Sequence, residues 1–193
     1  MEQTKNVAGG NIAGHDVITN YAVSNIPQTF MARLREKFEY ERANSVEFKS
    51  IIDSLHYYQQ SIDQEPISLE KKFDLGKRHA CIFEALRAKE LFAKCMTRYT
   101  FSEAAQQVIA FCLGEIYQLF KARIVPLINK GETVEVVDGA VVEQVIQPVL
   151  HQLEENILGL MPQELEGMIY YLTANCFLWW HPRDANADLP SGA

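Results

Sequence analysis

The chain has 193 residues, of which 48% are hydrophobic and 22% are charged, a composition typical of one soluble globular domain. Its formal net charge of −7 argues against a general polyanion binder, and the charge is uneven: residues 1–100 carry 14 basic against 13 acidic side chains, residues 101–193 only 4 against 12. No signal-peptide segment follows Met1, and the four cysteines stand singly, so we expect a protein of the reducing cytoplasm.

A short repeat occupies the first 25 residues. Taken five at a time, residues 6–25 give NVAGG, NIAGH, DVITN and YAVSN, so that aliphatic side chains recur at Val7, Ile12 and Val17. Small residues between regularly spaced aliphatics suit a stacked, β-like arrangement. Two interpretations stay open: a Gly-rich tail, or strands that become ordered only by pairing with other copies or with a partner. In the second, these three aliphatic side chains belong to the interface.

Helical patterns begin after Pro27. Start signals and apolar spacing predict a first helix over about 28–42 and a second over about 45–61. A third runs from residue 68 toward residue 99, and Gly76 is expected to interrupt it because glycine destabilises a helix interior by about 1 kcal/mol.

The next two segments differ in how clearly they are helical. A helix over about 102–126 has one narrow polar line and is otherwise apolar, the pattern of a central helix. Residues 133–153 are ambiguous, because Asp138-Gly139 between valine-rich arms is also a hairpin signal. Valines that step by three and four throughout the segment favour a helix, in which Pro148 would produce a kink.

The last apolar segment is the most informative part of the chain. Residues 164–180, ELEGMIYYLTANCFLWW, are nearly free of charge, and Pro162 suits the first turn of a helix that we expect to reach about Trp180. The uncharged part is too short for a membrane span, so this helix must bury against the chain's own core or another subunit. Trp179 and Trp180 are therefore candidate interface residues.

These segments together predict an all-α fold. We expect an antiparallel bundle of about six helices over residues 26–182, preceded by the short, β-like N-terminal arm of residues 1–25 and followed by a disordered tail over residues 183–193.

Candidate catalytic and cofactor groups are scarce. Gly9 and Gly14 have the spacing of a phosphate-binding loop but lack the lysine and hydroxyl that should follow them. No CxxC or HExxH motif indicates a metal site. Apolar neighbours should raise the pKa of the Cys176 thiol, which opposes reactivity. We therefore expect no enzyme activity, no cofactor and no metal.

One basic stretch stands out in the acidic chain. Six lysines and arginines against two glutamates lie between Lys77 and Arg98, and Arg87, Lys94 and Arg98 are the candidate contact residues. Three interpretations remain: the helix faces the acidic C-terminal half of its own chain, it binds an acidic protein partner, or it binds nucleic acid.

Three stretches resemble a known family. They are NVAGGNIAGHDVIT, which is similar to the Gly-rich "AGGDIxGxD" leaders of bacterial conflict proteins, LRAKELFAKCMTRYTFSEAAQQVIAFCLGEIYQLFKARIVPLI, and ELEGMIYYLTANCFLWW, which is similar to a "GMIYFLTGNC" ending. The chain thus resembles a small subunit or C-terminal domain of the bacterial ABC-three-component defence systems, the group that includes Lamassu. It departs from the ending at Ala174 and at residues 177–179, which a docking role tolerates better than acid–base chemistry would.

The resemblance implies a role in anti-phage or anti-plasmid defence. In such a complex an ATPase resembling structural-maintenance-of-chromosomes (SMC) proteins senses foreign DNA, and a separate, nuclease-type effector does the damage. Met1 leads almost directly into the leader, so we expect a non-catalytic linker between these partners, in a homo- or hetero-oligomer that meets DNA only through the complex and does not enter a membrane. The alternative is a helical protein that binds nucleic acid directly through residues 77–98.

Overall fold

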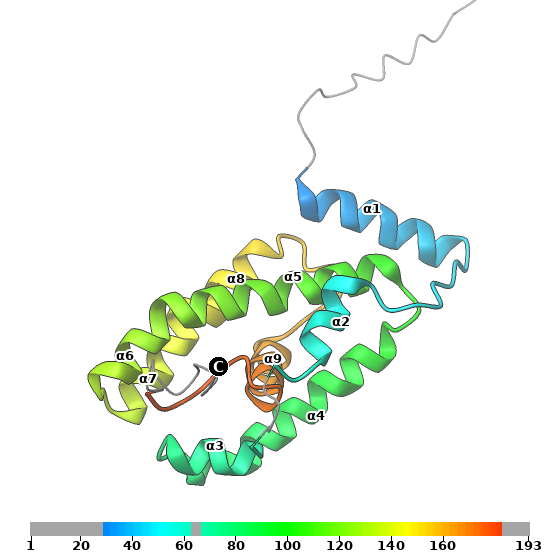
Figure 1. Cartoon of the computed structure of the whole chain (residues 1–193). Coiled ribbons are helices and arrows are strands. Elements are labelled where there is room, and N and C mark those ends of the chain that lie inside the picture. Colours follow the sequence, from blue (N-terminus) through cyan, green and yellow to red (C-terminus); the bar gives the residue numbers. More distant parts are fainter. Residues whose placement is uncertain (1–28, 63–66, 183–193) are drawn as a thin grey trace, which may run out of the picture.

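The computed structural model describes residues 29–62 and 67–182, and every regular element in these ranges is helical. The predicted all-α class is confirmed, whereas the N-terminal arm and the C-terminal tail lie outside the described residues. Chain order is visible in Figure 1. The elements are α1 (Phe30–Ala43), α2 (Asp53–Gln59), α3 (Leu69–Leu75), the 3₁₀ turn η1 (His79–Cys81), α4 (Ile82–Arg98), α5 (Glu103–Leu119), the π-helical turn η2 (Phe120–Ile124), α6 (Val125–Lys130), α7 (Val134–Val141), the π-helical turn η3 (Val142–Ile146), α8 (Gln147–Gln152) and α9 (Pro162–Ala174).

Several helices begin where the sequence places a capping hydroxyl. The residues before α1, α3, α5 and α7 each accept a hydrogen bond from the backbone N–H three positions on, over 3.0 to 3.4 Å. Such a cap satisfies one of the N–H groups that a helix start leaves unpaired. These four caps are Thr29, Ser68, Ser102 and Thr133.

The predicted second helix is too long. Only Asp53–Gln59 is helical, and residues 45–52 form an irregular connection. The side chain of buried Gln106 in α5 accepts from the backbone N–H of Ile52 at 2.9 Å and donates to the carbonyl of Ser50 at 2.9 Å. A distant amide thus replaces the intrahelical bonds that the local pattern led us to expect.

Residues 134–152 are helical throughout, as the valine spacing predicted, and Gly139 lies inside α7. A π-helical turn precedes each of Pro126 and Pro148. Proline has no N–H to donate, and its ring clashes with the carbonyl four residues before it, so the helix widens there instead of breaking.

The last helix ends earlier than predicted, at Ala174 instead of Trp180. Cys176 has a left-handed backbone with φ of 65°, its N–H donates to the carbonyl of Thr173 at 3.1 Å, and the N–H of Phe177 donates to Leu172 at 2.9 Å. This is a Schellman motif. The left-handed position usually holds glycine, so a cysteine there gave no stop signal in the sequence.

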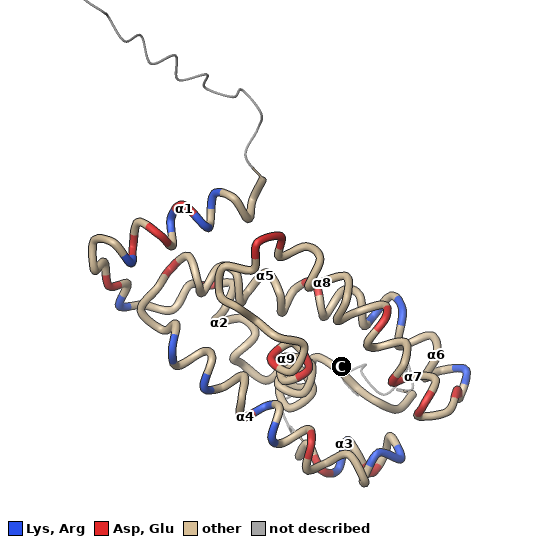
Figure 2. The backbone as a smooth tube through the Cα atoms, turned by 180° about the vertical axis from the view of Figure 1, so that it is seen from behind, with Lys and Arg blue, Asp and Glu red and all other residues tan. Residues whose placement is uncertain are grey.

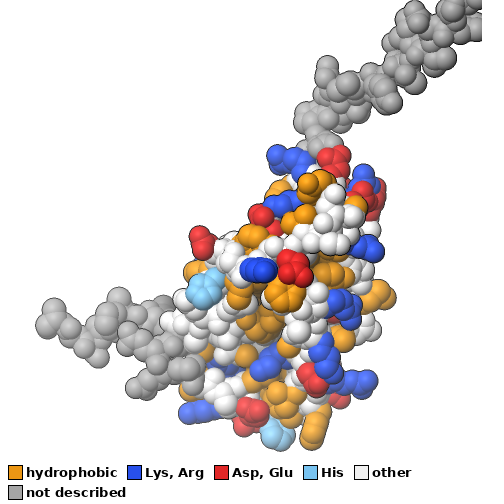
Figure 3. Space-filling model, turned by 90° about the vertical axis from the view of Figure 1, so that its right-hand side faces the viewer, with side chains coloured by type: hydrophobic (Ala, Val, Ile, Leu, Met, Phe, Trp, Pro, Cys, Tyr) orange, Lys and Arg blue, Asp and Glu red, His pale blue; other side chains and the backbone are white. Residues whose placement is uncertain are grey.

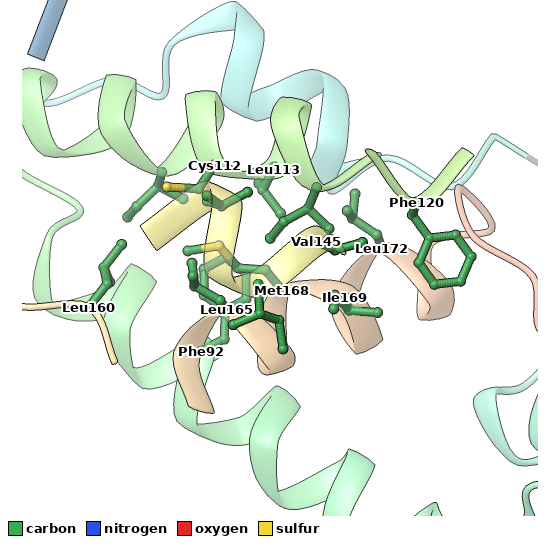
Figure 4. Close-up of a cluster of buried hydrophobic side chains, with 14 of the residues drawn as sticks. Phe92, Cys112, Leu113, Phe120, Val145, Leu160, Leu165, Met168, Ile169 and Leu172 are labelled. Atoms are coloured by element: carbon green, nitrogen blue, oxygen red, sulfur yellow. The ribbon is translucent and has the colours of Figure 1, made fainter. Parts of the chain in front are cut away.

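Helix α9 occupies the centre of the molecule, packed against both α4 and α5. It is seen nearly end-on in Figure 1 while α5 runs across the view, so α9 crosses α5 and the two do not lie antiparallel. Figure 4 shows the core that results, with apolar side chains from α4, α5, η3 and α9 meeting between the helices. The nearly charge-free segment predicted to need burial is therefore buried in the chain's own core.

Gly167 lies where α9 packs closely against α4. A Cβ added there would lie 2.9 Å from the carbonyl carbon of Ala88 and 2.9 Å from Cβ of Phe92. Only glycine lets the two backbones approach this closely. The spacing of α4 from α9 therefore depends on this residue.

Candidate functional site

The outward side of α4 carries a surface of mixed basic and apolar character. We call the α4 face the five exposed residues that follow one another at helical spacing along this side, namely Phe83, Arg87, Leu91, Lys94 and Arg98. Phe83 is 81% exposed, which is exceptional for a phenylalanine. The basic positions of α4 follow one another along its length in Figure 2.

The charges of the α4 face are only partly neutralised. Lys94 pairs with Glu90 of the same helix at 2.8 Å, and the guanidinium of Arg98 lies 6.0 Å from the ring of Tyr99. Arg87 has no ion pair with any residue that the structure describes. Exposed pairs within one helix contribute only about 0.3–0.5 kcal/mol, so Lys94 can exchange Glu90 for another partner.

A surface hollow of about 550 Å³ continues the α4 face at the C-terminal end of the helix. Arg42 of α1 and Arg98 of α4 stand on its rim, and Phe101, 59% exposed, contributes an apolar wall. Figure 3, which shows the molecule from the right-hand side of Figure 1, has exposed hydrophobic side chains between charged ones on that side. The face and the hollow together form a surface that an elongated partner could cover.

Arg78 is a cation of the basic stretch that binds the acidic half of the chain. It is 5% exposed, forms an ion pair with Asp138 of α7, and its guanidinium lies 4.2 Å from the ring centre of Trp180. Stacking on an aromatic face together with a carboxylate pair is the usual environment of a buried guanidinium. The intramolecular interpretation of the basic stretch therefore holds for Arg78 and not for Arg87.

The two tryptophans predicted as interface residues have different environments. Trp180 is 5% exposed, packs against Phe73 and Phe120, and donates its indole N–H to the hydroxyl of Thr173 at 3.1 Å. Trp180 thus contributes its surface to the chain's own core, not to a surface patch. Trp179 is half-buried, and its indole N–H donates to the carbonyl of Cys176 at 3.2 Å.

The other three predicted interface residues, Val7, Ile12 and Val17, lie outside the described residues, and their role stays a prediction.

A buried lysine, which was not among the predicted site residues, lies at the end of α9. Lys72 of α3 is 0% exposed, and its ammonium donates to the carbonyls of Thr173 at 2.5 Å and Ala174 at 3.3 Å. It also lies 2.9 Å from Sγ of Cys176 and 5.0 Å from the ring centre of Trp179. A cation at a helix C-terminus interacts favourably with its dipole. Here the ammonium adds a donor to the carbonyl of Thr173, which already accepts from the N–H of Cys176, and a further one to the carbonyl of Ala174.

A signal for this burial was present in the sequence. Lys72 shares one helical face with Leu69, Phe73 and Gly76, since these positions are three and four apart, and both Leu69 and Phe73 are buried. The adjacent Lys71, which is exposed, made the pair resemble an ordinary solvated surface.

Two cysteines, Cys95 and Cys112, are buried in the apolar core. Burial raises the pKa of Cys95 from 9.0 to about 11 and raises the pKa of Cys112 further. Within the described ranges, no group of three or more histidine, cysteine, aspartate or glutamate side chains is placed to hold a metal ion. Likewise, no described helix combines the length and apolar character needed to cross a membrane.

The described part of the chain is a helical domain whose helix α4 exposes both basic and apolar side chains. The sequence model of C-terminal domain 9 (CTD9) of the ABC-three component (ABC-3C) systems matches residues 68–180, which is more than half of the chain. The chain therefore belongs to the CTD9 family and is a component of an ABC-3C system. The match runs from the cap of α3 to Trp180 and so includes both α4 and the Lys72 site. No curated protein and no solved structure matched the chain.

Proposed function

We propose that the chain is a non-catalytic linker subunit of a bacterial defence complex, which joins an SMC-like ATPase that senses foreign DNA to a separate, nuclease-type effector. Membership in a three-component family supports the presence of other subunits. The resemblance to Lamassu supports an ATPase sensor as one of these subunits. We place the complex in the cytoplasm, where foreign DNA would be met.

The α4 face is the observation that carries this proposal. Contact surfaces between proteins combine large apolar side chains with arginines, which are enriched among the residues that contribute most to binding. Phe83 and Leu91 supply the apolar part, and Arg87 and Arg98 supply the cations. Arg87, which forms no ion pair with a described residue, follows the exposed Phe83 by one helical turn, and this pairing favours a partner surface that is acidic and apolar.

The test is binding of the purified full chain to the ATPase and effector encoded beside it, followed by titration calorimetry. We expect Arg87→Glu combined with Arg98→Glu to weaken the complex by about tenfold or more, because reversed charges would repel an acidic partner. Arg123→Glu, which makes the same type of charge reversal at an exposed position of η2, is the matched control and should bind like the wild type. Equal affinity for all variants would contradict the α4 face as the docking site.

Direct binding of nucleic acid is the second candidate, and the unpaired Arg87 is the observation that favours it. Phosphate contacts would make the affinity for duplex DNA fall steeply with salt concentration. A mobility-shift titration at two salt concentrations, with Arg87→Glu and Lys94→Glu as loss-of-binding variants, distinguishes the two functions. A subunit that shifts no DNA at low salt removes this candidate.

We further propose that residues 1–25 assemble copies of the chain or pair with a partner strand. Deletion of residues 1–25 should then reduce the mass in solution, measured by light scattering. An unchanged oligomeric state would count strongly against the arm as an assembly element.

A further inference from the structure

Lys72 and Cys176 form a closed pair of reactive side chains that linker activity does not require. They are 104 positions apart in the sequence, both are 0% exposed, and Nζ of Lys72 lies 2.9 Å from Sγ of Cys176. An amine and a thiol at hydrogen-bond distance, both shielded from solvent, are positioned so that the amine is the nearest nucleophile once the sulfur has been oxidised.

Each partner is held in place from its own side. Lys72 lies in α3, whose start is capped by Ser68, and its ammonium is fixed by the carbonyls of Thr173 and Ala174. Cys176 occupies the left-handed position of the Schellman motif that ends α9. The pairing is therefore set by backbone geometry at both ends and does not depend on a flexible surface side chain.

A small neutral oxidant has a route to the sulfur. Cys176 lines a hollow of about 330 Å³, bounded by Tyr117, Lys121 and Leu178 among others. Hydrogen peroxide is little larger than water, so it fits in this hollow beside the side chain of Cys176.

We propose that peroxide joins Lys72 to Cys176 through a covalent sulfur–nitrogen bond, which makes this pair a modification site. The thiol first reduces one peroxide: Cys–SH + H₂O₂ gives Cys–SOH + H₂O, and sulfur is oxidised by two electrons while the O–O bond breaks. Lys72 then releases one ammonium proton to water, and its neutral amine attacks the sulfenyl sulfur: Cys–SOH + H₂N–Lys gives Cys–S–NH–Lys + H₂O. The S–O bond breaks, the S–N bond forms, and one amine proton leaves with the hydroxide as water.

The same reaction is not available to the other thiols. No lysine amine lies within hydrogen-bond reach of Cys81, Cys95 or Cys112 among the described residues, and Cys95 and Cys112 are buried in the apolar core. Oxidation of Cys176 also has an immediate local trap, because sulfenic acids condense readily with a neighbouring nucleophile. The bond would tie α3 to the end of α9 and replace the ammonium that caps it.

The test treats the full-length wild-type protein with hydrogen peroxide, alkylates the remaining thiols, and maps tryptic peptides by mass spectrometry. We expect a peptide pair joined between Lys72 and Cys176, lighter by two hydrogen atoms than the sum of its parts, with no cleavage after Lys72. Treatment with dithiothreitol should restore both peptides. Oxidation of Cys176 to sulfinic acid with normal cleavage after Lys72, or a disulfide from Cys176 to another cysteine, would overturn the proposal.

Substitutions distinguish the contribution of the Lys72 amine to the cross-link from that of the cysteine thiols. Lys72→Arg keeps the positive charge and should lose the cross-link, and a triple Cys→Ala variant at the other three thiols should keep it. Circular dichroism establishes that each variant is folded. If a variant does not fold, the peptide map of the wild-type protein alone decides whether the cross-link forms. The test involves no partner protein, so its outcome is independent of the linker proposal.

Discussion

Gly167 offers a sharp test of how α4 and α9 fit together. Alanine at this position would place a Cβ against the carbonyl of Ala88 and 2.9 Å from Cβ of Phe92. The backbone carbonyl of Ala88 cannot rotate away, so the two helices must move apart. Gly167→Ala should therefore destabilise the protein although alanine is the better helix former.

The magnitude follows from two opposing terms. Replacing a helical glycine by alanine gains about 1 kcal/mol. Overpacking a well-packed interior costs about 1–3 kcal/mol, and a clash with backbone belongs at the upper end or above. We expect a net loss of about 2 kcal/mol in the free energy of unfolding, a substantial part of the roughly 5–15 kcal/mol of a typical domain.

Gly139→Ala is the matched control. Gly139 also lies inside a helix, α7, but a Cβ there would meet nothing within 4 Å. This variant should gain stability by up to about 1 kcal/mol from helix propensity alone. Urea unfolding followed by circular dichroism measures both changes. A Gly167→Ala protein as stable as the wild type, with Gly139→Ala stabilised as expected, would refute the close approach of α4 and α9.

Three further predictions concern capping, titration and a buried amide. Glu41 of α1 accepts from the hydroxyl of Ser102 at 2.6 Å and from the N–H of Ala104 at 3.2 Å. Glu41→Ala should therefore lower the free energy of unfolding, measured by thermal unfolding, by about 2 kcal/mol. Glu39→Ala, at an exposed position of the same helix, should lower it little. Burial raises the pKa of Cys95 to about 11, so the folded state keeps a proton that the unfolded chain loses near pH 9. The free energy of unfolding should therefore fall as the pH rises from 9 to 11. If Cys95 causes this fall, Cys95→Ala should reduce it by about 2 kcal/mol. Gln106→Leu should speed amide hydrogen exchange across residues 45–52, and an unchanged rate there would contradict the role of this side chain.

Much of the architecture was readable from local sequence. The helix starts at Ser68 and Ser102 were visible because a cap and the N–H that it binds are only three residues apart. The valine spacing of residues 134–152 likewise outweighed the Asp-Gly hairpin signal. Arg87, Lys94 and Arg98 were singled out as candidate contact residues from the charge of residues 77–98, and the structure places all three at exposed positions of α4.

The remaining features depend on residues distant in sequence. The connection over residues 45–52 is irregular because Gln106 binds its backbone. Trp180 is buried because Arg78 and Phe73, which lie about 100 positions earlier in the chain, pack against its ring. The sequence by itself determined the all-α class and most helix starts, since those depend on interactions within about one turn. Only the tertiary structure decided that Lys72 is buried against Cys176, because a buried ammonium needs acceptors, and its acceptors come from the far end of the chain.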